Sequence, residues 1–212
     1  LHGHRQLCRV RSNRAQRDRL KRTKTIVANR CRLLLAATFI LSGFVKAVDP
    51  LGTQYKLHDY LEAMGMAGMV PDWATLTASV LLAAIEFSLG IHMLFAIRRR
   101  LMTRVVLAVM VVMTLLTVWI AIANPVKDCG CFGDAIVLTN MQTLGKNIVL
   151  LVCAVVTARW HALMPRLVSR RNQWIVRNYS ALFVLAASLI SLYTLPIFDF
   201  RPHHTGADIR QG

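Results

Sequence analysis

Five long apolar blocks divide the chain and limit the folds open to it. Each block is about 16 to 25 residues long, close to the length of helix that crosses a bilayer. Backbone polar groups in lipid must pair within their own segment, so each block is predicted to be a transmembrane helix. We therefore expect an all-α, polytopic membrane helical bundle with spans at 33–48, 73–97, 105–123, 140–158 and 175–195.

Basic residues are concentrated in alternate connections between these blocks. Twenty of the 26 Lys and Arg residues lie in three segments, 1–32, 98–104 and 159–177. Cytoplasmic loops carry this excess in membrane proteins. The pattern predicts a protein of the cytoplasmic (inner) membrane with its N-terminus inside and its C-terminus outside.

The same pattern divides the chain into four regions. They are a basic cytoplasmic arm (1–32), a four-helix membrane core (33–160), a basic inner loop with a fifth C-terminal transmembrane helix (161–196) and an external tail (197–212). The arm lacks a signal-peptide-like apolar run and apolar periodicity, so we expect no cleaved signal and a disordered segment resting on anionic lipid. It also lacks aromatic residues for stacking on bases, so we expect no nucleic acid partner.

The segment after the first span is predicted to form a short helix. The first helix should end at the segment Asp49-Pro50-Leu51-Gly52-Thr53, where the chain changes direction. Within 54–70 the apolar residues then recur at helical spacing, at Leu57, Tyr60, Leu61 and Met64. This stripe predicts an amphipathic helix on the outer interface, which packs against the bundle or acts as a lid.

Several polar residues lie within the predicted spans. Lys46 is near the outer end of its span, where we expect it to extend to the headgroups. Glu86 is a carboxylate within the second span, which marks either a functional residue or a neutral, hydrogen-bonded support. We expect it to be protonated or paired with a neighbouring span, and Glu86→Gln to be tolerated.

The segment 124–134 is a polar, glycine-punctuated island between two spans, and it contains Cys129-Gly130-Cys131. A following capping box, with Thr139 as N-cap and Gln142 at N3, predicts that the fourth span begins near Asn140. Cys153, deep in that span, should be inert because apolar burial disfavours the thiolate.

A CxC pair on the oxidising side of a membrane can form a disulfide if Gly130 lets the chain bend. A loop this small adds little stability, and its strain makes the bond labile, which favours a redox-active pair over a structural one. Two alternatives stay open. Cys129 and Cys131 could bind zinc together with His203 and His204, or the island could be only a docking turn.

The sequence also resembles a known family. The matching residues are 39–46 (Phe-Ile-Leu-Ser-Gly-Phe-Val-Lys), Asp49-Pro50, 86–90 (Glu-Phe-Ser-Leu-Gly), 128–134 (Asp-Cys-Gly-Cys-Phe-Gly-Asp) and Leu138-Thr139. Together they resemble the DoxX-like membrane proteins and are closest to the methylamine utilisation protein MauE branch, over roughly residues 30–160.

This resemblance implies disulfide formation during maturation of an extracytoplasmic partner, as for methylamine dehydrogenase, together with a thioredoxin-like protein. Cys129 and Cys131 would be the redox pair, and Glu86 a buried polar support. The DoxX name implies an alternative, a quinone-linked oxidoreductase subunit with quinone as cofactor. A non-catalytic membrane scaffold is the third hypothesis.

Overall fold

The computed structural model describes residues 2–66, 68–123, 139–165 and 167–193, and these residues form helices joined by turns. Five helices are long and apolar enough to cross a membrane. The α-helices are α1 (His2–Val48), α2 (Pro50–Ala63), α3 (Asp72–Leu94), α4 (Arg99–Ala123), α5 (Asn140–Arg159) and α6 (Gln173–Tyr193). Two short 3₁₀ turns, His161–Leu163 and Arg170–Asn172, lie between α5 and α6.

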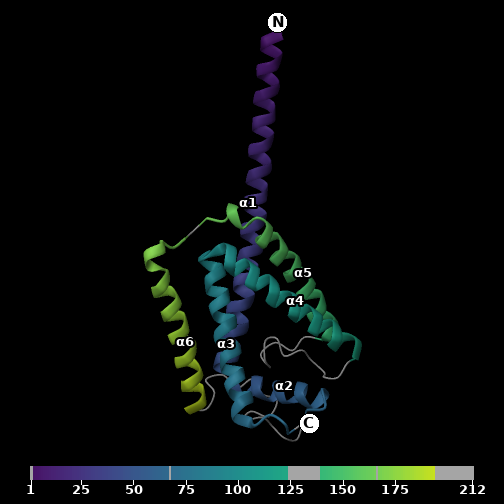
Figure 1. Ribbon diagram of the computed structural model, residues 1–212, viewed down its shortest axis with the longest axis vertical. Coiled ribbons are helices and arrows are strands. Elements are labelled where there is room, and N and C mark those ends of the chain that lie inside the picture. Colours follow the sequence, from purple (N-terminus) through teal and green to yellow (C-terminus); the bar gives the residue numbers. More distant parts are fainter. Residues whose placement is uncertain (1, 67, 124–138, 166, 194–212) are drawn as a thin grey trace, which may run out of the picture.

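Helices α1, α3, α4 and α5 pack into a four-helix core, and α6 packs on α3 and α1 (Figure 1). Helix α2 lies across one end of this bundle, which we call the α2 end. The first part of α1 projects from the opposite end, which we call the arm end. The chain is thus a multi-pass membrane protein, and its apolar outer side chains contact the lipid.

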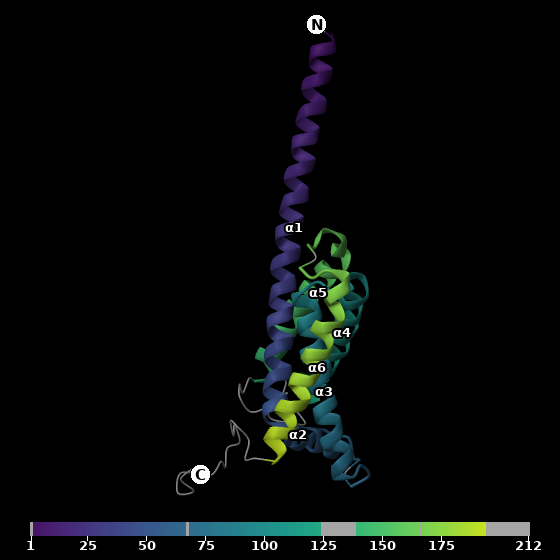
Figure 2. The same cartoon turned by 90° about the vertical axis from the view of Figure 1, so that its left-hand side faces the viewer.

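Helix α1 is a single 47-residue helix that runs from the arm into the bundle without a break (Figure 2). The prediction that residues 1–32 lack regular structure was therefore wrong. Arg, Lys, Gln and Leu favour helix, and after Gly3 the arm contains no Gly or Pro. The helix of the first span can therefore propagate backwards into the arm, since extending a helix needs no new nucleus.

The junction of α1 and α2 is a single residue, Asp49. Its side chain accepts a hydrogen bond from Gly52 N at 2.9 Å, and Pro50 occupies the first helical position. Both are favoured helix-start features. The predicted break is confirmed, but the amphipathic helix begins at Pro50, earlier than expected. It ends at Ala63, and after the C-cap Met64 the φ of 74° at Gly65 closes a Schellman motif.

The other predicted spans are confirmed with shifted ends. The capping box at Thr139 and Gln142 is present, and α5 begins at Asn140 as predicted. Helix α3 ends at Leu94, and α4 begins at Arg99, six residues before the predicted start. The connection between them is tight because Ala96 and Arg98 have φ values of 52° and 42°.

The interior of the four-helix core differs along its length. The half toward the arm end is an apolar cluster of Leu35, Ala36, Phe39, Leu89, Met93, Val106, Met110, Leu150, Cys153 and Ala154. The half toward the α2 end contains buried polar side chains, namely Ser42, Lys46, Glu86, Thr114, Thr117, Thr143 and Asn147. We call these the apolar half and the polar half. The half toward the arm end also holds buried His92, Thr103 and Thr157, but the buried carboxylate, Glu86, lies in the polar half.

Candidate functional site

The predicted redox pair, Cys129 and Cys131, lies outside the described residues, as do His203 and His204 of the zinc alternative. The structure does describe the two anchors of the cysteine segment, Ala123 at the end of α4 and Thr139 before α5. Both anchors are at the α2 end of the bundle (Figure 1). The chain therefore enters and leaves the cysteine segment at the end where the polar half of the core lies.

Glu86 is the centre of the polar half. It is buried at 6% exposure, and its Oε2 accepts hydrogen bonds from Ser42 Oγ at 2.7 Å and Lys46 Nζ at 2.6 Å. Lys46 also donates to Ser42 Oγ at 2.8 Å, which closes a triangle of three polar groups. Ser42 and Lys46 are four residues apart on α1, so one face of that helix presents both to α3.

The position of Lys46 corrects the sequence prediction. Its side chain does not extend to the membrane surface; it is 3% exposed and forms an ion pair with Glu86. The desolvation cost of a buried ammonium is large unless a carboxylate pairs with it. Glu86 supplies that carboxylate within the core, so the lysine is held inside the bundle.

Close packing of α1 against α3 makes these short contacts possible. A Cβ added to Gly43 would lie 2.4 Å from Phe87 N, and one added to Gly90 would lie 2.7 Å from Ile40 N. Neither glycine can carry a side chain without moving the opposing backbone. Small residues at such a crossing let two membrane helices approach closely, and here they bring Glu86 within hydrogen-bonding distance of Ser42 and Lys46.

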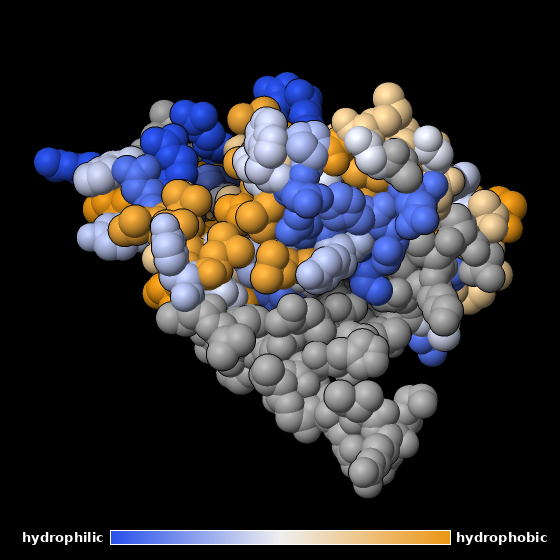
Figure 3. Space-filling model, turned by 90° about the horizontal axis from the view of Figure 1, so that it is seen from below, coloured by the Kyte–Doolittle hydropathy of each residue, from blue (hydrophilic) through white to orange (hydrophobic). Residues whose placement is uncertain are grey.

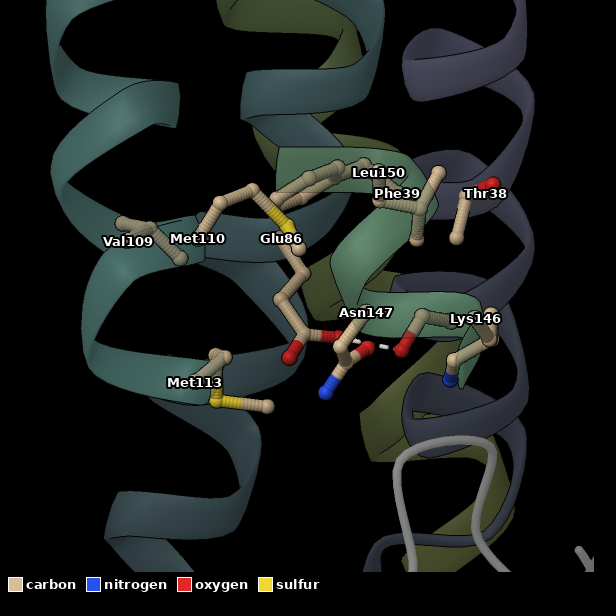
Figure 4. Close-up of a pocket in the computed structure, with 10 residues that line it drawn as sticks. Thr38, Phe39, Glu86, Val109, Met110, Met113, Lys146, Asn147 and Leu150 are labelled. Carbon is tan, nitrogen blue, oxygen red and sulfur yellow. Dashed lines mark hydrogen bonds between the residues drawn. The ribbon is translucent and has the colours of Figure 1, made fainter. Parts of the chain in front are cut away.

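A cavity of about 40 Å³ lies beside Glu86. All four core helices line it: Thr38, Phe39 and Ser42 from α1, Glu86 from α3, Val109, Met110 and Met113 from α4, and Lys146, Asn147 and Leu150 from α5. The carboxylate of Glu86 points toward Asn147 (Figure 4). The cavity is polar on one side and large enough for about one water molecule.

The α5 wall of this cavity is tied to α4. Asn147 Nδ2 donates to Thr117 Oγ1 at 2.6 Å, and both residues are buried. Thr117 in turn donates to the Met113 carbonyl one turn earlier. The polar half therefore contains two hydrogen-bonded groups, one joining α1 to α3 and one joining α4 to α5, on either side of a small cavity.

Comparison with known families identifies the chain. Residues 24–159 match the family described as methylamine utilisation protein MauE, over more than half of the chain. This chain belongs to the MauE family. No curated protein and no solved structure matches it. The match extends from the arm through α5, so it contains the whole four-helix core, the cysteine segment and α2, and it ends before α6.

The membership establishes a membrane protein of methylamine utilisation. The MauE match includes two further cysteines that the structure describes, buried Cys153 and partly buried Cys31. Cys153 belongs to the apolar cluster and Cys31 packs against it, and neither forms a disulfide. This location in an apolar environment suits the inert role predicted for Cys153.

Sequence reasoning on this MauE-family chain singled out Glu86 but missed its partners. Lys46 was expected at the membrane surface. Thr117 and Asn147, which form the second hydrogen-bonded group, were not singled out. One signal was available. Ser42 and Lys46 are four residues apart, so they lie on one face of the first span. A basic residue on such a face is the expected partner of a carboxylate in a neighbouring span. Among the described residues, no group of three His, Cys, Asp or Glu could hold a metal ion.

Proposed function

We propose that this MauE-family protein carries out thiol–disulfide exchange at the outer face of the cytoplasmic membrane, through Cys129 and Cys131. The exchange would support disulfide formation in an extracytoplasmic partner of methylamine utilisation, together with a thioredoxin-like protein. The observation that supports this most is that the cysteine segment is anchored, at Ala123 and Thr139, at the end of the bundle that contains the polar half.

The proposed exchange proceeds through a mixed disulfide. A thiolate of the partner attacks one sulfur of the Cys129–Cys131 disulfide and releases the other cysteine as a thiolate. A second partner thiolate then attacks the mixed disulfide, so the partner gains a disulfide and the CxC pair is left as a dithiol. Two electrons and two protons must then leave that dithiol, and a membrane quinone is the chemical class of acceptor that we propose.

The charge distribution supports the proposed orientation. Described basic residues at the arm end include Arg98, Arg99, Arg100 and Arg104, and the basic arm itself projects from there. The α2 end carries the carboxylates of Asp59, Glu62 and Asp72 on its exposed surface. Figure 3 views the α2 end, where hydrophilic and hydrophobic side chains are interspersed. By the positive-inside rule, the arm end is cytoplasmic and the α2 end external.

In this proposal the Lys46–Glu86 pair positions helices and does not react. It holds α1 against α3 in the half of the core that is nearer to the anchors of the cysteine segment. The Asn147–Thr117 hydrogen bond holds α4 against α5 in the same way. The cavity beside Glu86 has room for about one water molecule, which is too little for a quinone ring. A quinone would therefore bind elsewhere, so this cavity does not support the alternative function, a quinone-linked oxidoreductase subunit.

A trapping experiment tests the proposal. In intact membranes, alkylation before and after mild dithiol treatment should show Cys129 and Cys131 partly oxidised. In Cys131→Ser, the Cys129 thiolate should attack the disulfide of an oxidised thioredoxin-like protein and accumulate as a mixed disulfide, because Cys131 is absent to resolve it.

The matched control is Cys153→Ala, which removes a core thiol at 8% exposure and should trap nothing. The redox proposal would be wrong if Cys129 and Cys131 were free thiols under all conditions and the double Ser variant supported normal partner maturation. The cysteine segment would then be a docking turn of a scaffold protein.

A further inference from the structure

A second, larger cavity lies at the arm end, away from the cysteine anchors. It has a volume of about 330 Å³ and lies between the α3–α4 turn and the start of α6. Its lining includes His92, Ile97, Arg98, Met102, Trp174 and Arg177. The volume is at the lower end of the range of small-ligand pockets, about 300–1,000 Å³. We call this cavity the arm-end groove.

The arm-end groove has a one-sided charge. Arg98 comes from the turn and Arg177 from α6, so two separate elements contribute a guanidinium, and none of the lining residues is acidic. An Arg guanidinium is always charged and matches the geometry of a phosphate group. Two such groups facing one cavity without a carboxylate favour an anionic ligand.

The backbone at Arg98 adds a second observation. Its φ of 42° and that of Ala96, 52°, are both in the left-handed region that non-glycine residues rarely adopt. This conformation is strained for a residue with a side chain and is found where the surrounding structure imposes it, often at ligand sites. A glycine would adopt it freely, yet the chain places an arginine there, at the wall of the groove.

The rest of the groove is suited to hydrocarbon. Ile97 is buried, Met102 is partly buried, and Trp174 is 57% exposed at the start of a membrane span. Trp at this position is typical of the membrane–water interface. His92 donates from Nδ1 to the Ser88 carbonyl, at 2.6 Å, which fixes its ring at the wall. The ligand therefore needs an anionic head near the arginines and an apolar body toward α3 and α4.

We propose that the arm-end groove binds an anionic phospholipid, with its phosphate between Arg98 and Arg177 and its acyl chains against Ile97, Met102 and Trp174. Basic pockets between helices at the cytoplasmic side of membranes have the chemistry to take such headgroups. The bound lipid occupies the space between α6 and the α3–α4 turn and joins α6 to the family core at this end. This site is independent of the proposed cysteine chemistry.

The test uses the full chain in nanodiscs of phosphatidylcholine with and without phosphatidylglycerol. Native mass spectrometry should show phosphatidylglycerol retained by the wild type. Arg98→Gly should lower its apparent affinity about fivefold, the effect expected for one basic contact. Arg177→Gln should do the same, and the double variant should lose more. Because glycine accepts the φ at position 98, Arg98→Gly should keep its melting temperature in pure phosphatidylcholine.

Arg100→Gln is the matched control. It removes a neighbouring charge that does not line this groove, so phosphatidylglycerol retention should be unchanged. Equal retention of phosphatidylglycerol by the wild type and the double variant would overturn the proposal, and so would equal retention of phosphatidylcholine. If inorganic phosphate raised the melting temperature of the wild type as much as phosphatidylglycerol does, the ligand would be a free anion and the lipid assignment wrong.

Discussion

The two halves of the four-helix core are built from the same helices but are stabilised differently. The apolar half is filled by side chains such as Leu35, Met93 and Val106, which need only fit one another. The polar half depends on specific pairs, Lys46 with Glu86 and Asn147 with Thr117. An apolar contact can be replaced by another of similar volume. A buried charge or amide cannot lose one partner without leaving the other unsatisfied.

This difference teaches where function can be located in such a bundle. Packing alone would have produced an apolar core along its full length, at lower desolvation cost. The chain instead places an ion pair, an amide and several hydroxyls near the end from which the cysteine segment extends. Buried polar groups in membrane spans are expensive and by default functional, so the polar half is the part of the core to perturb first.

The largest effect is expected at the ion pair. Glu86→Ala should lower the free energy of unfolding in micelles by about 3–5 kcal/mol, because buried Lys46 loses the Glu86 carboxylate that pairs with it. This revises the sequence-based expectation for Glu86→Gln, which removes the same charge and should also destabilise. The double variant Lys46→Met, Glu86→Leu should recover most of the loss. If the single and double variants unfold alike, the two residues are not coupled and the polar half behaves like the apolar one.

A smaller effect is expected at the close crossing of α1 and α3, which runs through both halves. Gly43→Ala should cost about 1–3 kcal/mol in the same assay, because its Cβ would meet the Phe87 backbone. Gly145→Ala on α5 meets nothing within 4 Å and should stabilise the protein by about 0.5–1 kcal/mol. In the background of the double ion-pair variant, the destabilisation by Gly43→Ala should disappear only if the close crossing is needed solely to hold the ion pair together.

The smallest effect is expected at the second polar pair. Asn147→Leu should cost about 0.6 kcal/mol, the average for a hydrogen bond between membrane helices. A double-mutant cycle with Thr117→Val, measured by unfolding in micelles, isolates the coupling. A coupling as large as that of the ion pair would show that uncharged hydrogen bonds stabilise the polar half equally.

Much of this fold could be predicted because its signals are local. Apolar length predicted the five spans, the Thr139–Gln142 box predicted the start of α5, and Asp49-Pro50 predicted the end of α1. Each of these depends on residues adjacent in the chain. The cysteine segment was recognised by its residues, and its redox role stays a prediction.

The errors concern partners that are distant in sequence. Lys46 near the end of a span has the pattern of a surface lysine, and only the packing of α1 on α3 reveals Glu86 opposite, 40 residues away. The arm illustrates a different failure. Its lack of apolar periodicity predicted disorder. Apolar periodicity marks a helix face that packs against other elements, so a helix surrounded by water can form without it.

The continuous α1 helix determines which part of the arm lies within electrostatic range of the membrane surface. Lys24 lies 5.8 Å from the ring centre of Trp160, a residue type that prefers the membrane surface. From Lys24 to Arg14 a helix rises about 15 Å, nearly two Debye lengths at physiological ionic strength. If α1 stands upright as it leaves the bundle, attraction to lipid headgroups acts on the base of this rod and fades toward its tip. The exposed side chains of Arg14 and Arg17 then carry their charges in the aqueous phase, away from the membrane surface.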